Sequence, residues 1–106
     1  MVSGWLFTDD IGESVKIEVK EKDLAGATSV EILVLNPDKE NVTWDAVPVR
    51  REKDPKFIDV THIIKEGDID KPGRYLVSVS AKTPDGEILI PSRTLWVYDR
   101  QKGRSI

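Results

Sequence analysis

The stretch Ser14-Val15-Lys16-Ile17-Glu18-Val19-Lys20 alternates polar and apolar residues without a fault. Successive side chains of an extended chain point to opposite faces, so the three apolar residues share one face and the charged residues share the other. This period of two predicts a half-buried strand in an antiparallel sheet. It is the dominant period of the chain, and other segments repeat it.

Segments further along the chain continue the strand pattern. Residues 30–35 are apolar at nearly every position, which predicts a central strand covered on both faces, and the following Asn36-Pro37-Asp38-Lys39 predicts a turn. Pro48 has no N–H to donate, so the strand expected at residues 42–49 should lie at an edge or end there. Other strands are expected near residues 5–7 and at residues 56–61, 75–80 and 87–98, the last interrupted at Pro91 by a bulge or a switch of sheet.

Seven strands with turn signals about every ten residues are typical of an all-β, immunoglobulin-like antiparallel sandwich. An OB-like barrel is the alternative.

Residues 63–69 are expected to form one helical turn, and Ile63, Ile64 and Ile69 would cap one end of the core. Tyr75 follows the Pro72-Gly73 turn at the position of a tyrosine corner. Its hydroxyl is therefore expected to bond the backbone of residues 63–69 rather than to act in catalysis.

The composition excludes several classes of protein. The chain has 106 residues, 39% of them hydrophobic and 33% charged, with a net charge of -3 and no cysteine. This length predicts one domain over residues 1–106, and the lack of cysteine excludes disulfides, thiolate metal sites and cysteine nucleophiles. We expect no signal peptide, no membrane span, synthesis in a cytoplasm and no nucleic-acid partner, because the chain has neither the required apolar stretches nor a basic stripe.

The residues that carry chemistry are sparse. His62 is the only histidine, and its place between a strand and a loop favours a surface or capping role over a catalytic one. Asp68 and Asp70 lie in a loop between expected strands, where carboxylates cap turns in most cases and bind calcium in a few. We therefore predict no enzymatic activity and no cofactor, with Asp68 and Asp70 as candidates for a calcium site.

Aromatic and basic residues suggest where a partner would bind. Trp5, Trp44 and Trp96 are candidates for a sugar-stacking or partner-binding face. Trp96 lies between two apolar residues, which favours the core, whereas Trp44 lies between Thr43 and Asp45 on an expected edge strand and is the best candidate for an exposed anchor. Burial of Trp44 in the core is the alternative. Residues 100–106 form a basic C-terminal tail, in which Arg100, Lys102 and Arg104 would contact an acidic neighbour.

Four short motifs occur in an order that resembles a family of phage proteins. They are Asp10-Ile11-Gly12, Leu24-Ala25-Gly26-Ala27-Thr28, Asn36-Pro37-Asp38-Lys39 and Gly67-Asp68-Ile69-Asp70-Lys71-Pro72-Gly73-Arg74-Tyr75. With them, residues 9–98 are similar to the immunoglobulin-like virion proteins of tailed bacteriophages and to the N-terminal domain of phage baseplate upper proteins. The sequence departs from that pattern at Lys39, where the family's turn carries glycine, and in the highly charged loop at residues 50–55.

The resemblance implies a non-enzymatic structural protein of a phage or prophage virion, located in the virion. A capsid decoration protein and a tail or baseplate accessory subunit both fit it. The expected partners are other virion proteins, with a homo-oligomer as one possibility. The alternative is a free-standing module that binds a glycan or a host surface, which requires an exposed aromatic platform.

Overall fold

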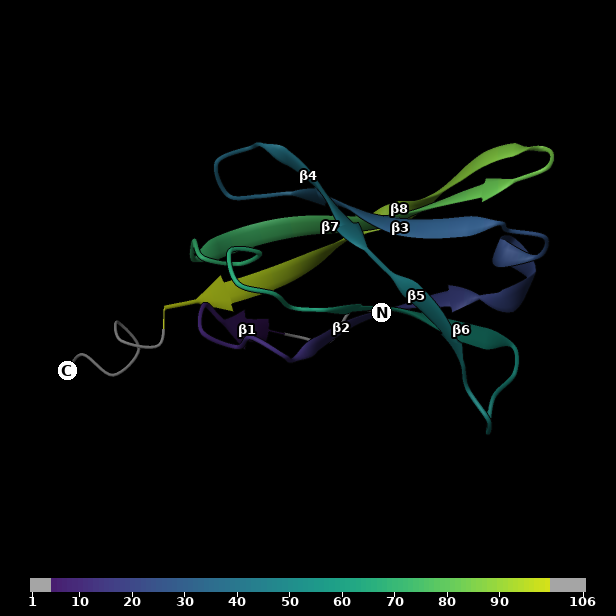
Figure 1. Cartoon of the computed structure of the whole chain (residues 1–106), viewed down its shortest axis with the longest axis horizontal. Coiled ribbons are helices and arrows are strands. Elements are labelled where there is room, and N and C mark those ends of the chain that lie inside the picture. The colour runs from purple at the N-terminus through teal and green to yellow at the C-terminus, as the bar shows by residue number, and fades with distance from the viewer. Residues whose placement is uncertain (1–4, 100–106) are drawn as a thin grey trace.

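The computed structural model describes residues 5–99, and these residues form two packed β-sheets (Figure 1). The five-stranded sheet has the order β1 (Trp5–Phe7), β8 (Gly86–Tyr98), β7 (Gly73–Thr83), β3 (Ser29–Leu35) and β4 (Asn41–Asp45). The three-stranded sheet has the order β2 (Ser14–Lys20), β6 (Phe57–Ile63) and β5 (Val47–Arg50). Neighbouring strands are antiparallel except β1 and β8, which are parallel.

This arrangement confirms the all-β, immunoglobulin-like sandwich. The chain crosses between the sheets from β2 to β3 and again from β6 to β7, which is the Greek-key connectivity of that architecture. The two sheets are separate hydrogen-bonded layers rather than one closed sheet, so the OB-like alternative is wrong. The residues that the structure describes contain no helix long and apolar enough to cross a membrane.

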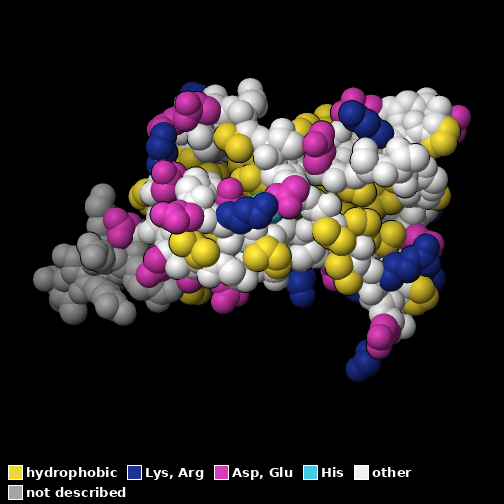
Figure 2. All heavy atoms as spheres, in the orientation of Figure 1, with side chains coloured by type: hydrophobic (Ala, Val, Ile, Leu, Met, Phe, Trp, Pro, Cys, Tyr) yellow, Lys and Arg dark blue, Asp and Glu magenta, His cyan; other side chains and the backbone are white. Residues whose placement is uncertain are grey.

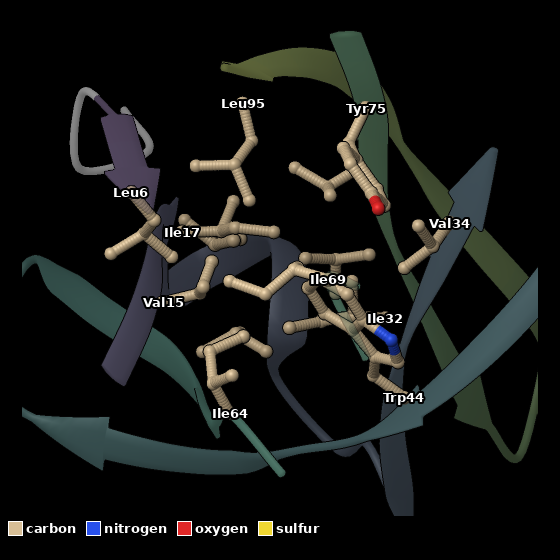
Figure 3. Close-up of a cluster of buried hydrophobic side chains, with 14 of the residues drawn as sticks. Leu6, Val15, Ile17, Ile32, Val34, Trp44, Ile64, Ile69, Tyr75 and Leu95 are labelled. Carbon is tan, nitrogen blue, oxygen red and sulfur yellow. The ribbon is translucent and has the colours of Figure 1, made fainter. Parts of the chain in front are cut away.

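The core lies between the sheets and is built from alternate residues of the strands. Val15, Ile17 and Val19 of β2 are buried, as the period of two predicts. Figure 3 shows Val15 and Ile17 facing side chains of the other sheet. Eighteen hydrophobic residues form this single cluster, which draws on both sheets. They are Leu6, Val15, Ile17, Val19, Leu24, Ile32, Val34, Trp44, Ile58, Val60, Ile64, Ile69, Tyr75, Val77, Val79, Ala81, Leu95 and Val97.

Residues 5–99 contain eight strands rather than the predicted seven, because the segment at residues 42–49 divides at Ala46. Its first part, β4, pairs with β3 in the larger sheet, and its second part, β5, pairs with β6 in the smaller one (Figure 1). Pro48 lies in β5 at the edge of its sheet, as predicted. The expected irregularity at Pro91 is also present, since the β7–β8 register shifts by one residue between the pairs Val77–Arg93 and Val79–Ile90.

The helical turn predicted at residues 63–69 is wrong. The described residues contain one short helix, the 3-10 helix η1 (Glu21–Leu24), between β2 and β3. Ile64 and Ile69 are buried, but Ile63 is 51% exposed. Ile63 is the last residue of β6, and the alternation that turns Val60 and His62 inward turns it outward.

The tyrosine corner is present at the start of β7. The buried Tyr75 hydroxyl donates a hydrogen bond of 2.7 Å to the carbonyl of Lys71, which lies just beyond the predicted segment. Burial raises the pKa of this hydroxyl, so it remains a neutral donor.

Nearby, Gly73 has a φ of 136°, and a Cβ at that position would lie 3.0 Å from two side-chain carbons of Pro37. The turn after β3 and the start of β7 are therefore in close contact.

Candidate partner-binding surface

Four aromatic side chains lie together on the outer face of the larger sheet. The β1–β8 register pairs Trp5 with Trp96 and Phe7 with Tyr98, while Leu6 between them is buried. Trp5 is 58% exposed, Trp96 45% and Tyr98 49%, and Phe7 is half-buried. We call these four residues the aromatic patch. Because β1 is an edge strand, the patch lies at the border of the sheet.

The rings of the aromatic patch pack on one another at steep angles. The Trp5 ring lies 5.1 Å from that of Phe7 at 87°, and 6.2 Å from that of Tyr98 at 75°. Edge-to-face packing is a favourable arrangement of aromatic rings, so the neighbours hold Trp5 in place despite its exposure. The rings therefore form an uneven surface rather than a flat plane. They line a shallow groove of about 760 Å³ together with Pro72, Gly73, Val97 and Asp99.

Among residues 5–99, one arginine lies beside the patch. Arg74 of β7 is the partner of Trp96 in the β7–β8 register, and its side chain is exposed on the same outer face. It forms no side-chain hydrogen bond or salt bridge with any residue between 5 and 99. On its other side lies a smaller hollow of about 230 Å³, whose lining consists of the apolar Leu35, Pro37 and Leu76, the polar Asn36, the charged Lys39 and Arg74 itself.

The outer face of the smaller sheet has the opposite character. Arg51 lies 2.6 Å from Asp59 and 2.9 Å from Glu18, which links the charged side chains of this face to one another. The hydrogen bonds to Arg51 hold the pKa of Asp59 below its usual value, and they raise the pKa of Arg51. These charges are paired within the chain and stay in contact with water, so this face has no evident need of a partner.

An aliphatic area lies at the free edge of the smaller sheet. Figure 2 shows hydrophobic side chains gathered over β5, where Val47 is 63% and Val49 48% exposed. Charged side chains border it, and Arg50 next to it lies 3.4 Å from Glu21. Two valines offer much less surface than the aromatic patch and no unpaired charge. The aromatic patch is therefore the stronger candidate for a binding surface.

The predictions for Trp44 and Trp96 are both wrong, in opposite directions. Trp44 is only 2% exposed and lies opposite Ile32 in the core (Figure 3). Its ring stacks on that of His62 at 4.7 Å and 15°. Thr43 and Asp45 occupy the outer face of β4, so alternation turns Trp44 inward. Trp96 points outward because Leu95 and Val97 on either side fill the core.

The place of His62 between a strand and a loop indicated a surface or capping role. The structure shows that the side chain is buried and not at the surface. It is 2% exposed, its Nδ1 lies 2.6 Å from the Asp45 carbonyl oxygen, and its Nε2 lies 2.7 Å from Asp68 Oδ2. Lys65 covers this site with an ion pair of 2.9 Å to Asp45, which lowers the pKa of that carboxyl. The ring thus connects β6 with the end of β4 and with the loop before β7.

The calcium candidates have different surroundings. Asp68 Oδ2 accepts a hydrogen bond of 2.8 Å from the Lys65 backbone in addition to its contact with His62, whereas Asp70 is exposed. Within the described part of the chain, no three side chains of His, Cys, Asp or Glu converge where they could hold a metal ion. Asp68 therefore has a structural role here, and the calcium prediction gains no support.

Two further points concern the predicted contact residues. Arg100, Lys102 and Arg104 lie outside the described residues, so their role stays a prediction. Sequence reasoning missed Phe7 and Tyr98, although the alternation of Trp5-Leu6-Phe7 and of Leu95-Trp96-Val97-Tyr98 contained the signal.

Comparison of the chain with protein-family models and with curated proteins finds no match.

Proposed function

We propose that this chain is a non-enzymatic structural protein of a phage or prophage virion, a capsid decoration protein or a tail or baseplate accessory subunit. It acts by binding another virion protein through the aromatic patch. The assignment to a virion rests on the sequence resemblance alone. The binding role rests on the patch, which is the observation that carries the proposal.

The size and composition of the patch support a protein partner. At the exposures of Trp5, Trp96 and Tyr98, on the order of 300 Å² of aromatic surface faces solvent. An apolar area of this size is at the lower end of the largest patches on monomeric proteins, which are often functional. Tryptophan, tyrosine and arginine dominate the binding energy of protein interfaces, and all three types are present here, with Arg74 beside the rings.

A glycan is the second candidate partner, because two exposed tryptophans lie in register as neighbours. Sugar rings stack on flat aromatic faces. The 87° and 75° angles between Trp5 and its neighbours break the patch into separate planes, which does not suit a run of stacked sugars. An uneven apolar surface instead fits a protruding side chain of a protein, so we favour the protein partner.

The test is incorporation into particles. Virions assembled with the wild-type chain, with Trp96→Ser or with Leu89→Ser would be purified, and the copies per particle counted by quantitative mass spectrometry. Leu89 is a matched control, since it is also an exposed hydrophobic residue of β8, at 62%, and lies outside the patch. We expect at least a roughly tenfold loss for Trp96→Ser, as for removal of an interface hot spot, and none for Leu89→Ser.

Two results would contradict the proposal. One is the absence of the wild-type chain from purified particles, and the other is normal incorporation of Trp96→Ser. Thermal midpoints of both variants close to that of the wild type would show that neither has simply unfolded. Binding of the wild-type chain, but not of Trp96→Ser, to sugars on a glycan array would favour the second candidate instead.

A further inference from the structure

The position of Arg74 constrains what the aromatic patch binds. Outward-facing residues of β1, β3, β7 and β8 around it are aromatic, leucine or uncharged polar residues. They are Trp5, Phe7, Leu33, Leu35, Leu76, Ser78, Thr94, Trp96 and Tyr98. Asp99 lines the groove at the end of β8, but it makes no salt bridge with Arg74. Among residues 5–99, the other charged residues of this outer face are Glu31, Asp45, Lys82 and Glu87, and they lie further along the strands.

A partner of ordinary size must cover Arg74. Stable interfaces bury about 800 Å² on each side, and the exposed rings supply less than half of that. The nearest additional apolar surface is the hollow of Leu35, Pro37 and Leu76, and Arg74 lies between this hollow and Trp96. A partner that spans both regions therefore removes the Arg74 guanidinium from water.

Covering an arginine without giving it a counter-charge is strongly unfavourable, because the buried charge loses its hydration and gains nothing in return. Arg50 and Arg51 each have carboxylate partners within the chain, whereas Arg74 has none among the described residues. A second copy packed face to face would place each Arg74 against a surface made mainly of aromatic, leucine and uncharged polar residues. It would cover the charge without a clear counter-charge and would add a second arginine to the interface, which opposes association.

We propose that the partner is a different protein, whose contact segment carries an aspartate or glutamate beside a protruding apolar side chain. The apolar side chain packs against the aromatic patch, and the carboxylate pairs with Arg74 through the two parallel hydrogen bonds that a guanidinium offers. This inference rests on the proposed function and adds the chemistry of the partner to it.

Selection from a yeast-displayed library of random peptides tests the inference. The full chain would be used as bait in three forms: wild type, Arg74→Glu and Arg50→Glu. Arg50 is a matched control, because it is also an exposed arginine at a strand edge but lies on the other sheet. We expect the wild type and Arg50→Glu to enrich Asp or Glu next to Leu, Ile, Phe or Trp. We expect Arg74→Glu to select Lys or Arg at the acidic position instead.

The most enriched peptide would then be synthesised and its dissociation constant measured with each bait. Arg74→Glu should weaken binding by at least about 30-fold, the lower range for loss of a covered charge pair, and Arg50→Glu should leave it unchanged. The inference fails if no motif is enriched, or if Arg74→Glu selects the same motif as the wild type. It also fails if light scattering shows a wild-type dimer that Trp96→Ser dissociates, since the occupant would then be a second copy.

These outcomes separate the inference from the function on which it rests. If the wild type selects acidic apolar peptides but is absent from particles, the partner chemistry stands and the virion role fails. If Trp96→Ser is lost from particles while Arg74→Glu enters them normally, the virion role stands and the partner chemistry fails.

Discussion

The contact between His62 and Asp68 gives a quantitative prediction for Asp68→Asn. Asparagine keeps the shape of the side chain but leaves a neutral oxygen to accept from the Lys65 backbone and to face His62 Nε2. Hydrogen bonds to an ionised group contribute about 1.5–3 kcal/mol and neutral ones about 1 kcal/mol. With two bonds weakened in a partly buried site, we expect the free energy of unfolding to fall by about 2 kcal/mol. For a domain of this size that lowers the thermal midpoint by about 8 °C.

Asp70→Asn is the control for this experiment. It makes the same chemical change two residues away, at an exposed position of the same loop, and should stay within about 0.5 kcal/mol of the wild type. Differential scanning calorimetry at neutral pH measures both variants. Equal midpoints for Asp68→Asn and Asp70→Asn would refute the structural role of Asp68 and show that neither carboxylate matters to the loop.

Three further predictions concern Tyr75, Asp59 and the response to calcium. Tyr75→Phe removes the hydroxyl bonded to Lys71 and should cost about 1–2 kcal/mol in urea unfolding, whereas Tyr98→Phe at an exposed position should be nearly neutral. Asp59→Asn should destabilise the protein at pH 6 but progressively less below pH 4, because a carboxyl with a lowered pKa stabilises the fold above its unfolded pKa of about 3.9 and loses that effect as pH falls through the folded value. Addition of millimolar calcium chloride should leave the thermal midpoint unchanged, because Asp68 Oδ2 already contacts the Lys65 backbone and His62. An increase in the midpoint would support the calcium site at Asp68 and Asp70.

The period of two carried most of the fold prediction. It placed Val15, Ile17 and Val19 in the core and, with the turn signals, identified a sandwich, because strand alternation depends only on local geometry. The exchange of sheets at Ala46 was not predictable in this way. The segment at residues 42–49 is extended throughout, and the two sheets compete for it through contacts made with β3 and β6, which are distant in sequence.

The aromatic patch, which we propose as the binding surface, is predictable in type but not in place. Three tryptophans indicate an aromatic face, but the polar neighbours of Trp44 suggest that it is exposed and the apolar neighbours of Trp96 suggest that it is buried. In a strand the adjacent residues point the opposite way, so polar neighbours favour a buried residue and apolar neighbours an exposed one. The pairing of Trp5 with Trp96 required more, since it joins residues at opposite ends of the chain.

The energetics of the patch bear on how such a protein would act in a virion. Covering about 300 Å² of aromatic surface contributes roughly 8 kcal/mol, which is comparable to the 4–15 kcal/mol that association costs in lost motional freedom. The patch alone therefore cannot hold a partner tightly, and one charge pair at Arg74 adds only a few kcal/mol. Repetition of the partner on a particle does not change this balance for a chain with one binding site, because avidity requires two linked sites that bind at the same time. We therefore expect the isolated chain to bind its partner weakly, and firm retention on a particle would require further contacts beside the patch and Arg74.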